Sequence, residues 1–154
     1  MEEWTSLYEK AWKLAEKAHE GQVDKGGNPY IEHPLAVANR VVKPEAKVVA
    51  LLHDVLEDTR VTGEELRNLF PETVVRAVEL LTKEKGKGFS LEAYLAAIRE
   101  NELACCVKIA DLEHNMDLSR IPHPKERIIV GWSSIKKQKN IWKGRRRKNE
   151  TAFI

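Results

Sequence analysis

The sequence predicts an all-α protein, a compact bundle of helices in a single domain. Apolar residues recur at spacings of three and four through almost the whole chain of 154 residues, as on one face of a helix. No stretch alternates polar and apolar residues in the way a half-buried strand does. Glycine- and proline-containing breaks separate the periodic runs, so we expect roughly seven to nine helices.

The first half of the chain contains four of the expected helices. The first runs from Trp4 to His19, and the loop GQVDKGGNPY separates it from the short helix HPLAVANRVV, which has Pro34 in its first turn. One continuous helix, PEAKVVALLHDVLEDT, is then expected from Pro44. Thr62 and Glu65 form a capping-box pattern for a helix that runs toward Phe70.

The second half continues the helical pattern. Pro71 begins PETVVRAVELLTK, Ser90 is a suitable N-cap for LEAYLAAIRE, and ELACCVKIADLEHNM follows. After the break IPHP we expect a last helix over about 125–142 and a loose basic tail over 143–154. The core of the domain is therefore expected over about 4–142.

Composition and charge exclude several classes of protein. The formal net charge is only +2, so we expect no nucleic-acid partner. The chain has no apolar run of about 18 residues and no signal-peptide pattern at its start. The two cysteines are adjacent, which suits neither a disulfide framework nor a metal pair. These features predict a cytoplasmic protein with no membrane partner.

The segment LLHDVLEDT concentrates polar groups in an apolar region. On a continuous helix His53 and Glu57 are four residues apart, as are Asp54 and Asp58, so all four would share one broad strip. Burying unpaired carboxylates costs several kcal/mol each. Either lysine and arginine side chains or a divalent metal must compensate, and a structural ion-pair cluster is the simpler alternative.

Two other segments favour the metal. His33 lies where a loop turns into a helix, and Asp111 follows an apolar run, with Asn115 one turn later. His114 is an alternative ligand to Asp111. Two imidazoles and two carboxylates form a nitrogen and oxygen ligand set suited to manganese, iron or zinc. A set that lacks thiolates and leaves positions open indicates a catalytic metal.

The ordered motifs HP, ALLHDVLEDT and KIADLEHNM, with AHEGQ and NPYIEHPLAVA, resemble those of the HD-domain metal phosphohydrolases. More narrowly they resemble the hydrolase domain of RelA/SpoT-type proteins and the small stand-alone alarmone hydrolases, over about Ala11 to Asp117. The resemblance implies an HD-type helical bundle. It also implies removal of the 3′-pyrophosphate from guanosine tetra- or pentaphosphate, which converts the tetraphosphate ppGpp to GDP and pyrophosphate, with Mn²⁺ as the metal.

The resemblance implies a function for each matching residue. The metal ligands are His33, His53, Asp54 and Asp111, and the catalytic pair is Glu57 and Asp58. The residues implied in substrate binding are Lys25, Tyr30, Lys108 and Asn115. No synthetase segment fits in the remaining length, so we expect a stand-alone hydrolase. The sequence leaves the oligomeric state open, with a homodimer as one alternative.

Two positions depart from the family pattern. Asp24 lies where relatives usually have an arginine, and in ADLEHNM the residue Leu112 replaces another arginine. Both changes remove a cation that could bind a pyrophosphate. They leave two alternatives to the ppGpp hydrolase, namely an HD phosphohydrolase that acts on another nucleotide or a phosphomonoester, and a nucleotide-sensing HD module without turnover.

Overall fold

The computed structural model describes residues 2–24, 26–83 and 88–115. Within these ranges the chain forms eight α-helices and no β-strand, which confirms the all-α prediction. In chain order the helices are α1 (Glu2–Ala18), α2 (Glu32–Asn39), α3 (Pro44–Leu52), α4 (Val55–Asp58), α5 (Gly63–Leu69), α6 (Glu72–Leu81), α7 (Leu91–Arg99) and α8 (Glu102–Asn115).

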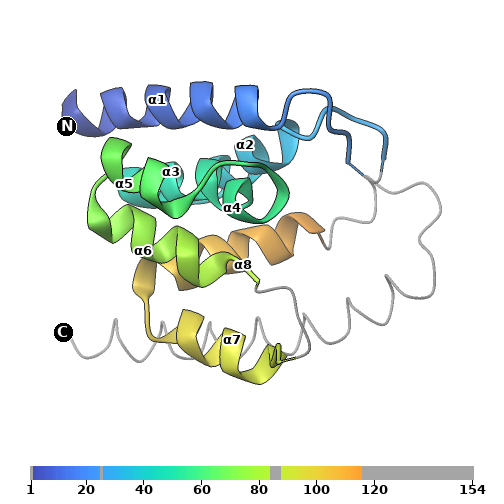
Figure 1. The fold of residues 1–154 in the computed structure, drawn as a ribbon, viewed down its shortest axis with the longest axis vertical. Helices are drawn as coiled ribbons and strands as arrows, with labels where there is room; N and C mark the ends of the chain where they lie inside the picture. Colours follow the sequence, from blue (N-terminus) through green and yellow to red (C-terminus); the bar gives the residue numbers. More distant parts are fainter. Residues whose placement is uncertain (1, 25, 84–87, 116–154) are drawn as a thin grey trace.

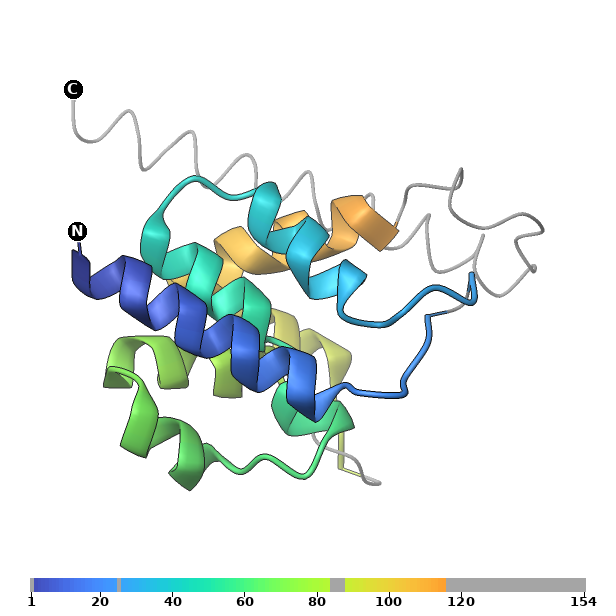
Figure 2. The same ribbon diagram turned by 90° about the horizontal axis from the view of Figure 1, so that it is seen from above.

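Helix α3 lies at the centre of the bundle. It packs against α1 on one side and against α2, α6 and α8 on the others (Figures 1 and 2). A helix with neighbours on every side has to be apolar all round. The second half of α3, VVALL, meets this requirement, and these residues from Val48 to Leu52 are fully buried. The polar residues that follow Leu52 therefore emerge directly from the densest part of the core.

Local capping signals set the starts of two helices as the sequence predicted. The Thr62 hydroxyl accepts a hydrogen bond of 3.2 Å from the backbone N–H of Glu65 at the start of α5. The Ser90 hydroxyl accepts one of 3.2 Å from the N–H of Ala93 at the start of α7. Each cap satisfies a backbone donor that has no partner within the helix.

The continuous helix expected over LLHDVLEDT is wrong, because the chain breaks at His53 and Asp54 between α3 and α4. The N–H of His53 donates to Ala50 O at 3.4 Å, three residues back rather than four. At Asp54 φ is −105° and ψ is −3°, away from helical values. The four polar side chains of this segment therefore do not form one strip of a single helix.

The loop between α1 and α2 is organised by Asp24. Its Oδ1 accepts hydrogen bonds from the N–H of Gly26 at 2.9 Å and of Asn28 at 3.0 Å. Gly27 has a φ of +83°, which favours glycine. Gln22 Nε2 donates to Asp58 O at 3.0 Å and ties this loop to α4. The carboxylate that replaces the expected arginine thus stabilises the turn that leads to Tyr30 and His33.

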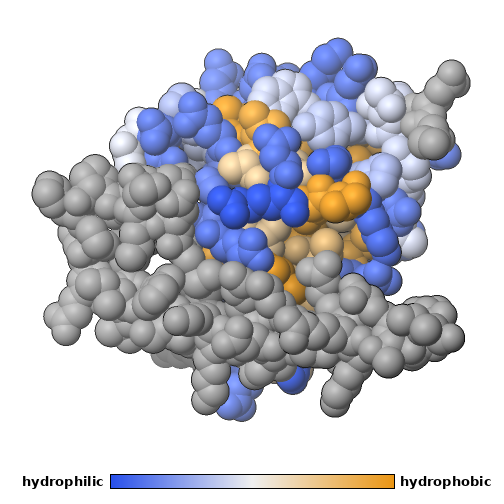
Figure 3. Space-filling model, turned by 180° about the vertical axis from the view of Figure 1, so that it is seen from behind, coloured by the Kyte–Doolittle hydropathy of each residue, from blue (hydrophilic) through white to orange (hydrophobic). Residues whose placement is uncertain are grey.

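The surface of the described part of the chain is mixed in character. On the face shown in Figure 3, hydrophilic residues surround a smaller hydrophobic area. None of the described helices combines the length and the apolar character needed to cross a lipid bilayer.

Several predictions fall outside the described residues. These are the last helix over 125–142, the basic tail over 143–154 and the proposed substrate contact of Lys25. The single domain with a core over 4–142 likewise stays a prediction.

Candidate metal centre

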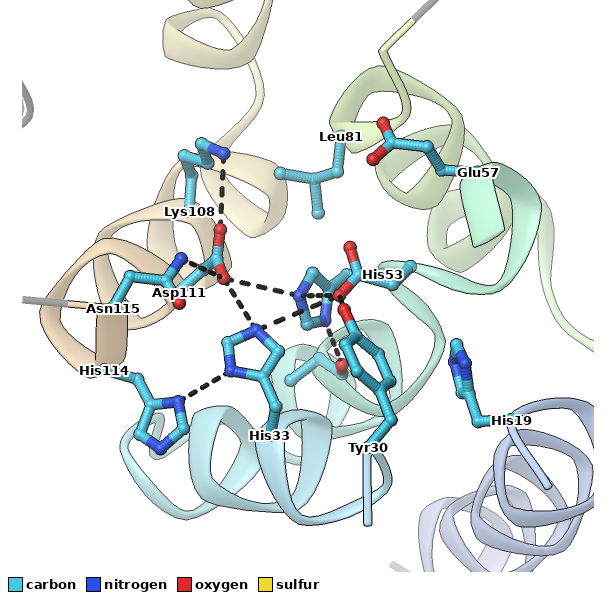
Figure 4. Close-up of polar contacts among 12 residues, drawn as sticks. His19, Tyr30, His33, His53, Glu57, Leu81, Lys108, Asp111, His114 and Asn115 are labelled. Atoms are coloured by element: carbon cyan, nitrogen blue, oxygen red, sulfur yellow. Dashed lines mark hydrogen bonds and ion pairs between the residues drawn. The ribbon is translucent and has the colours of Figure 1, made fainter. Parts of the chain in front are cut away.

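Three separate segments bring two imidazoles and two carboxylates together (Figure 4). His33 comes from the first turn of α2, His53 and Asp54 from the break between α3 and α4, and Asp111 from α8. His33, His53 and Asp111 are buried, with 4–7% of each residue exposed. The sequence-predicted ligands are thus neighbours in space, although 78 residues separate His33 from Asp111.

The ligand atoms converge on a small volume. His33 Nε2 lies 2.9 Å from Asp111 Oδ1 and 3.8 Å from Asp54 Oδ2. His53 Nε2 lies 3.1 Å from Asp54 Oδ2 and 3.5 Å from Asp111 Oδ1. Ligands about 2.0–2.2 Å from a common ion lie about 3–3.6 Å from one another. The ligand atoms of His33, His53 and Asp54 all lie within 4.8 Å of one another, and Asp111 Oδ1 lies against both histidines, so the cluster is compact enough to be a candidate site for one divalent ion.

The orientation of His53 also fits a metal ligand. Its Nδ1 lies 2.5 Å from Ala50 O, an acceptor that keeps a proton on Nδ1. Its Nε2 is buried and makes no hydrogen bond to any of the described residues. A buried polar nitrogen without such a bond is costly unless something else satisfies it. Its position beside two carboxylates indicates that a cation does so.

The charges at the centre depend strongly on one another. Burial opposes ionisation of Asp54, but the adjacent His53 outweighs it and lowers the pKa of Asp54 to about 2. Burial likewise raises the pKa of Asp111, but Lys108 and the two histidines hold that pKa well below its usual range. Burial lowers the pKa of His53, whereas Asp54 and Asp111 raise it further, so the net pKa is well above 6.5. Both carboxylates, Asp54 half-buried and Asp111 buried, therefore stay ionised and need positive charge nearby.

Glu57 and Asp58 lie next to this cluster. Ligand oxygens of Asp54, Glu57 and Asp58 come within 4.8 Å of one another, so Asp54 belongs both to this acidic group and to the group with His33 and His53. Glu57 Oε1 accepts a hydrogen bond of 2.8 Å from the N–H of Lys83, beyond the end of α6. Asp58 is exposed. The pair is thus placed at the accessible edge of the cluster.

Three predicted substrate residues contact the candidate ligands instead of standing apart from them. The Tyr30 hydroxyl donates to Asp54 Oδ2. Lys108 Nζ lies 3.3 Å from Asp111 Oδ2, and Asn115 Nδ2 donates to Asp111 Oδ1 at 3.3 Å. The burial of Lys108 opposes its charge, but Asp111 outweighs this effect and raises the pKa of Lys108. Each of these residues thus orients or neutralises a carboxylate of the cluster.

The second position that lost a cation, Leu112, lies on α8. Leu112 is buried in the core, with 5% of the residue exposed. Its neighbour Glu113 forms an ion pair of 3.8 Å with Arg40 of α2. The face of α8 next to Asp111 therefore packs against the core at Leu112, and its acidic residue is paired with a cation outside the ligand cluster.

Sequence reasoning missed the contacts of three buried groups. His19, just after α1, is 2% exposed, and its Nδ1 lies 3.0 Å from Gln22 Oε1. Tyr94, which no motif singled out, donates to Leu81 O, and its ring lies 5.5 Å from Lys108 Nζ. His114, considered as an alternative ligand, lies behind His33, with the two Nδ1 atoms 2.6 Å apart. The spacing of three residues between Asp111 and His114 was the available signal.

Comparison with known families agrees with this geometry. The sequence profile of the HD domain matches residues 11–101, more than half of the chain and a range that includes three of the four candidate ligands. The chain belongs to the HD domain family.

Several curated proteins are similar to this HD domain. A guanosine-3′,5′-bis(diphosphate) 3′-pyrophosphohydrolase from Haemophilus influenzae is 34% identical over 116 residues, which is 67% of this chain and 17% of that protein. The bifunctional (p)ppGpp synthase/hydrolase SpoT of Escherichia coli is 33% identical over 120 residues, or 70% of this chain and 17% of that protein. A probable GTP pyrophosphokinase from Mycobacterium leprae is 33% identical over 132 residues, or 79% and 17%. The chain thus spans about a sixth of the length of these relatives.

A solved structure shares the fold. It is described by the words "A metazoan ortholog of SpoT hydrolyzes ppGpp and plays a role in starvation responses". The TM-score is 0.68 with 24% sequence identity, and the match covers 86% of this chain and 82% of that chain. At this identity the likeness establishes the HD fold.

Proposed function

We propose that this HD domain is a metal-dependent phosphohydrolase that removes the 3′-pyrophosphate of guanosine tetra- or pentaphosphate. With ppGpp the products are GDP and pyrophosphate. The convergence of His33, His53, Asp54 and Asp111 carries the proposal, because it gathers two imidazoles and two ionised carboxylates in one compact cluster that a divalent ion could occupy. Curated relatives named as ppGpp hydrolases support the choice of substrate.

The four residues of the cluster would hold the ion, and we propose Mn²⁺. The absence of thiolates from the set and the mixture of nitrogen and oxygen atoms suit this metal. When bound, a divalent ion supplies Lewis-acid polarisation of a phosphoryl group and a lower pKa for the attacking water. The fit is also electrostatic, since Asp54 and Asp111 remain ionised in a buried cluster.

Glu57 and Asp58 are the proposed proton-transfer groups. Glu57 is half-buried at the edge of the cluster and can accept the proton of the attacking water. Asp58 is exposed and can order that water or return a proton to the leaving 3′ oxygen. The water oxygen bonds to the phosphorus as the bond from phosphorus to the 3′ oxygen breaks. Pyrophosphate is released, and the 3′ oxygen takes up a proton to become the ribose hydroxyl of the product.

Lysine side chains and Asn115 would bind the nucleotide. Lys108 and Lys25 are the proposed cations for the phosphates, and Tyr30 and Asn115 the proposed contacts to the rest of the nucleotide. Lys108 already faces Asp111. Its charge therefore offsets that of the carboxylate and leaves less positive charge for a phosphate than an unpaired lysine would offer.

A second candidate is a phosphohydrolase that acts on another nucleotide or a phosphomonoester. The observation in its favour is Asp24, whose carboxylate occupies the loop at the position of the expected arginine and is engaged by backbone N–H groups. An acid in this place repels a pyrophosphate. A sensing module without turnover is the third candidate.

A single assay separates the three candidates. Protein freed of metal with a chelator receives Mn²⁺ and is offered ppGpp, GTP, ATP or a phosphomonoester at equal concentrations. The proposal predicts pyrophosphate release from ppGpp that depends on added Mn²⁺ and is absent in Asp54→Ala. Release of phosphate or pyrophosphate from the other substrates alone would favour the second candidate. Metal binding without release from any of them would favour the third.

A further inference from the structure

The two imidazoles of the metal centre are held in different ways. His53 Nδ1 faces the backbone carbonyl of Ala50, which can only accept a hydrogen bond, so in the neutral ring Nδ1 carries the proton and Nε2 has the lone pair that a metal needs. The Nδ1 of His33 instead faces a second imidazole, with its Nδ1 only 2.6 Å from the Nδ1 of His114. An imidazole nitrogen can either donate or accept. The tautomer of His33 therefore depends on the side chain of His114.

The short distance between the two Nδ1 atoms limits where the protons can be. With two protons between them the N–H groups would clash, and with none the two lone pairs would repel, so one proton has to be shared. A metal at Nε2 of His33 uses the lone pair there. In a neutral ring the proton is then on Nδ1, and His114 Nδ1 has to be its acceptor.

The fold supports this contact from one helix. His114 follows Asp111 by three residues on α8, so both lie on the face that packs against α2. Asp111 Oδ1 lies 2.9 Å from His33 Nε2, and His114 faces the opposite nitrogen of the same ring (Figure 4). The rings of His33 and His114 are both buried, with centroids 4.8 Å apart and planes tilted by 31°. Helix α8 thus provides a contact to each ring nitrogen of His33, from Asp111 to Nε2 and from His114 to Nδ1.

We propose that His114 is a positioning residue that fixes the tautomer and orientation of His33 for metal binding. The inference rests on the proposed metal centre and adds a residue to it. Ligating histidines commonly donate their second N–H to an acceptor, and loss of that acceptor lowers metal affinity by about 10–100-fold. His114 is distinguished from a simple packing residue because its acceptor atom, not its volume, is what His33 needs.

Two substitutions separate these properties. His114→Asn keeps an oxygen acceptor near the position of Nδ1, whereas His114→Leu fills similar space without one. We expect Mn²⁺ affinity, measured by titration calorimetry on metal-free protein, to fall about 10–100-fold in His114→Leu and to recover largely in His114→Asn. The unfolding temperature of each metal-free variant is measured in parallel. Equal affinity of His114→Leu and wild type, or equal loss in both variants with an unchanged unfolding temperature, would overturn the proposal.

A measurement on the wild type keeps the test valid if His114→Leu does not fold. In protein loaded with diamagnetic Zn²⁺, ¹⁵N NMR of the imidazoles should show His33 protonated at Nδ1. An unprotonated Nδ1 in the Zn²⁺-loaded protein would reject the positioning role. If the wild type binds neither Zn²⁺ nor Mn²⁺, the proposed metal centre itself fails, a result distinct from a failure of His114 alone.

Discussion

At the scale of single residues, the chemistry of the HD domain depends on where each polar atom points. His53 and Asp54 are adjacent in sequence, yet both turn toward the ligand cluster because the helix breaks at this pair. Glu57 turns toward Lys83 instead, although it lies only a few residues further along. The two functions proposed for this segment, metal binding and proton transfer, are thus separated by local geometry.

Two substitutions test this separation. Asp54→Ala removes a ligand from the cluster, so we expect it to abolish both Mn²⁺ binding and hydrolysis. Glu57→Gln keeps the shape and leaves the four ligands in place, so we expect wild-type Mn²⁺ affinity and a turnover lower by about 100-fold or more. Calorimetry and the pyrophosphate assay measure the two quantities on the same preparations. Full turnover in Glu57→Gln would show that another group handles the proton.

The coupled charges predict how the stability of the metal-free protein depends on pH. The pKa of Asp54 falls from 3.8 to about 2 on folding, so its contribution is lost as the pH falls through this range. The pKa of His53 rises above 6.5 on folding, so its contribution is complete below 6.5 and is lost as the pH rises through the raised value.

We therefore expect the contribution of this pair to the free energy of unfolding to be largest between about pH 4 and 6.5. Urea titrations in the presence of a chelator measure it. In Asp54→Asn the loss on the alkaline side should shrink, because one of the charges that raise the pKa of His53 is gone. If stability fell as steeply with rising pH in that variant as in the wild type, Asp54 would not be one of the charges that raise the pKa of His53.

At the scale of elements, short connecting segments determine which residues of the helices lie at the ligand cluster. The loop before α2 sets the position of Tyr30 and His33, and Asp24 closes its turn through two backbone N–H groups. The backbone N–H of Asp24 also donates to Asn28 O at 2.8 Å. These hydrogen bonds therefore define the turn of the loop, although it lacks the arginine that relatives usually have at the position of Asp24.

Replacing Asp24 tests the loop. Asp24→Ala removes both acceptor contacts, and we expect a loss of about 1 kcal/mol in the free energy of unfolding, measured with urea. Asp24→Asn keeps an acceptor oxygen and should stay within a few tenths of a kcal/mol of wild type. A full loss in Asp24→Asn as well would indicate that the charge matters and not the hydrogen bonds.

At the scale of the whole molecule, α3 connects the core to the site. Its buried residues pack against four helices, and the chain leaves this packed region directly into His53 and Asp54. Leu51 and Leu52 are fully buried, whereas Leu91 at the start of α7 is 49% exposed. Damage to the centre of the bundle should therefore affect stability much more than damage at its edge.

Truncation of these leucines measures the difference. We expect Leu51→Ala to lower the free energy of unfolding by about 2–5 kcal/mol, from lost burial and the cavity left behind. Leu91→Ala should change it by about 0.5 kcal/mol or less. Urea unfolding of both variants provides the comparison. Similar values for the two would contradict the central place of α3.

Metal binding should stabilise the whole fold, because the proposed ligands come from α2, the break after α3, and α8. At a free Mn²⁺ concentration 100 times the dissociation constant, the gain is about 2.7 kcal/mol. A chelator should reverse it, which thermal unfolding with and without Mn²⁺ measures. Asp54→Ala serves as the control and should show no shift.

The sequence by itself determined the helical class, most helix positions and the four candidate ligands. Apolar periodicity, the caps at Thr62 and Ser90, and the His-Asp pair are local properties, so they are visible in the order of residues alone. The motif order was also sufficient to expect an HD-type protein, because the ligand types and their surroundings occur together.

Only the tertiary structure decided which atoms meet. The break at His53 and Asp54 contains neither glycine nor proline, so no local signal marks it, and the side chains at the break lie beside residues of α2 and α8. The pairing of His33 with His114 joins residues 81 positions apart. Such contacts arise when the apolar faces of helices pack and bring polar atoms together. The periodicity of the sequence shows which residues form the apolar face of each helix, but it does not show which other helix that face packs against.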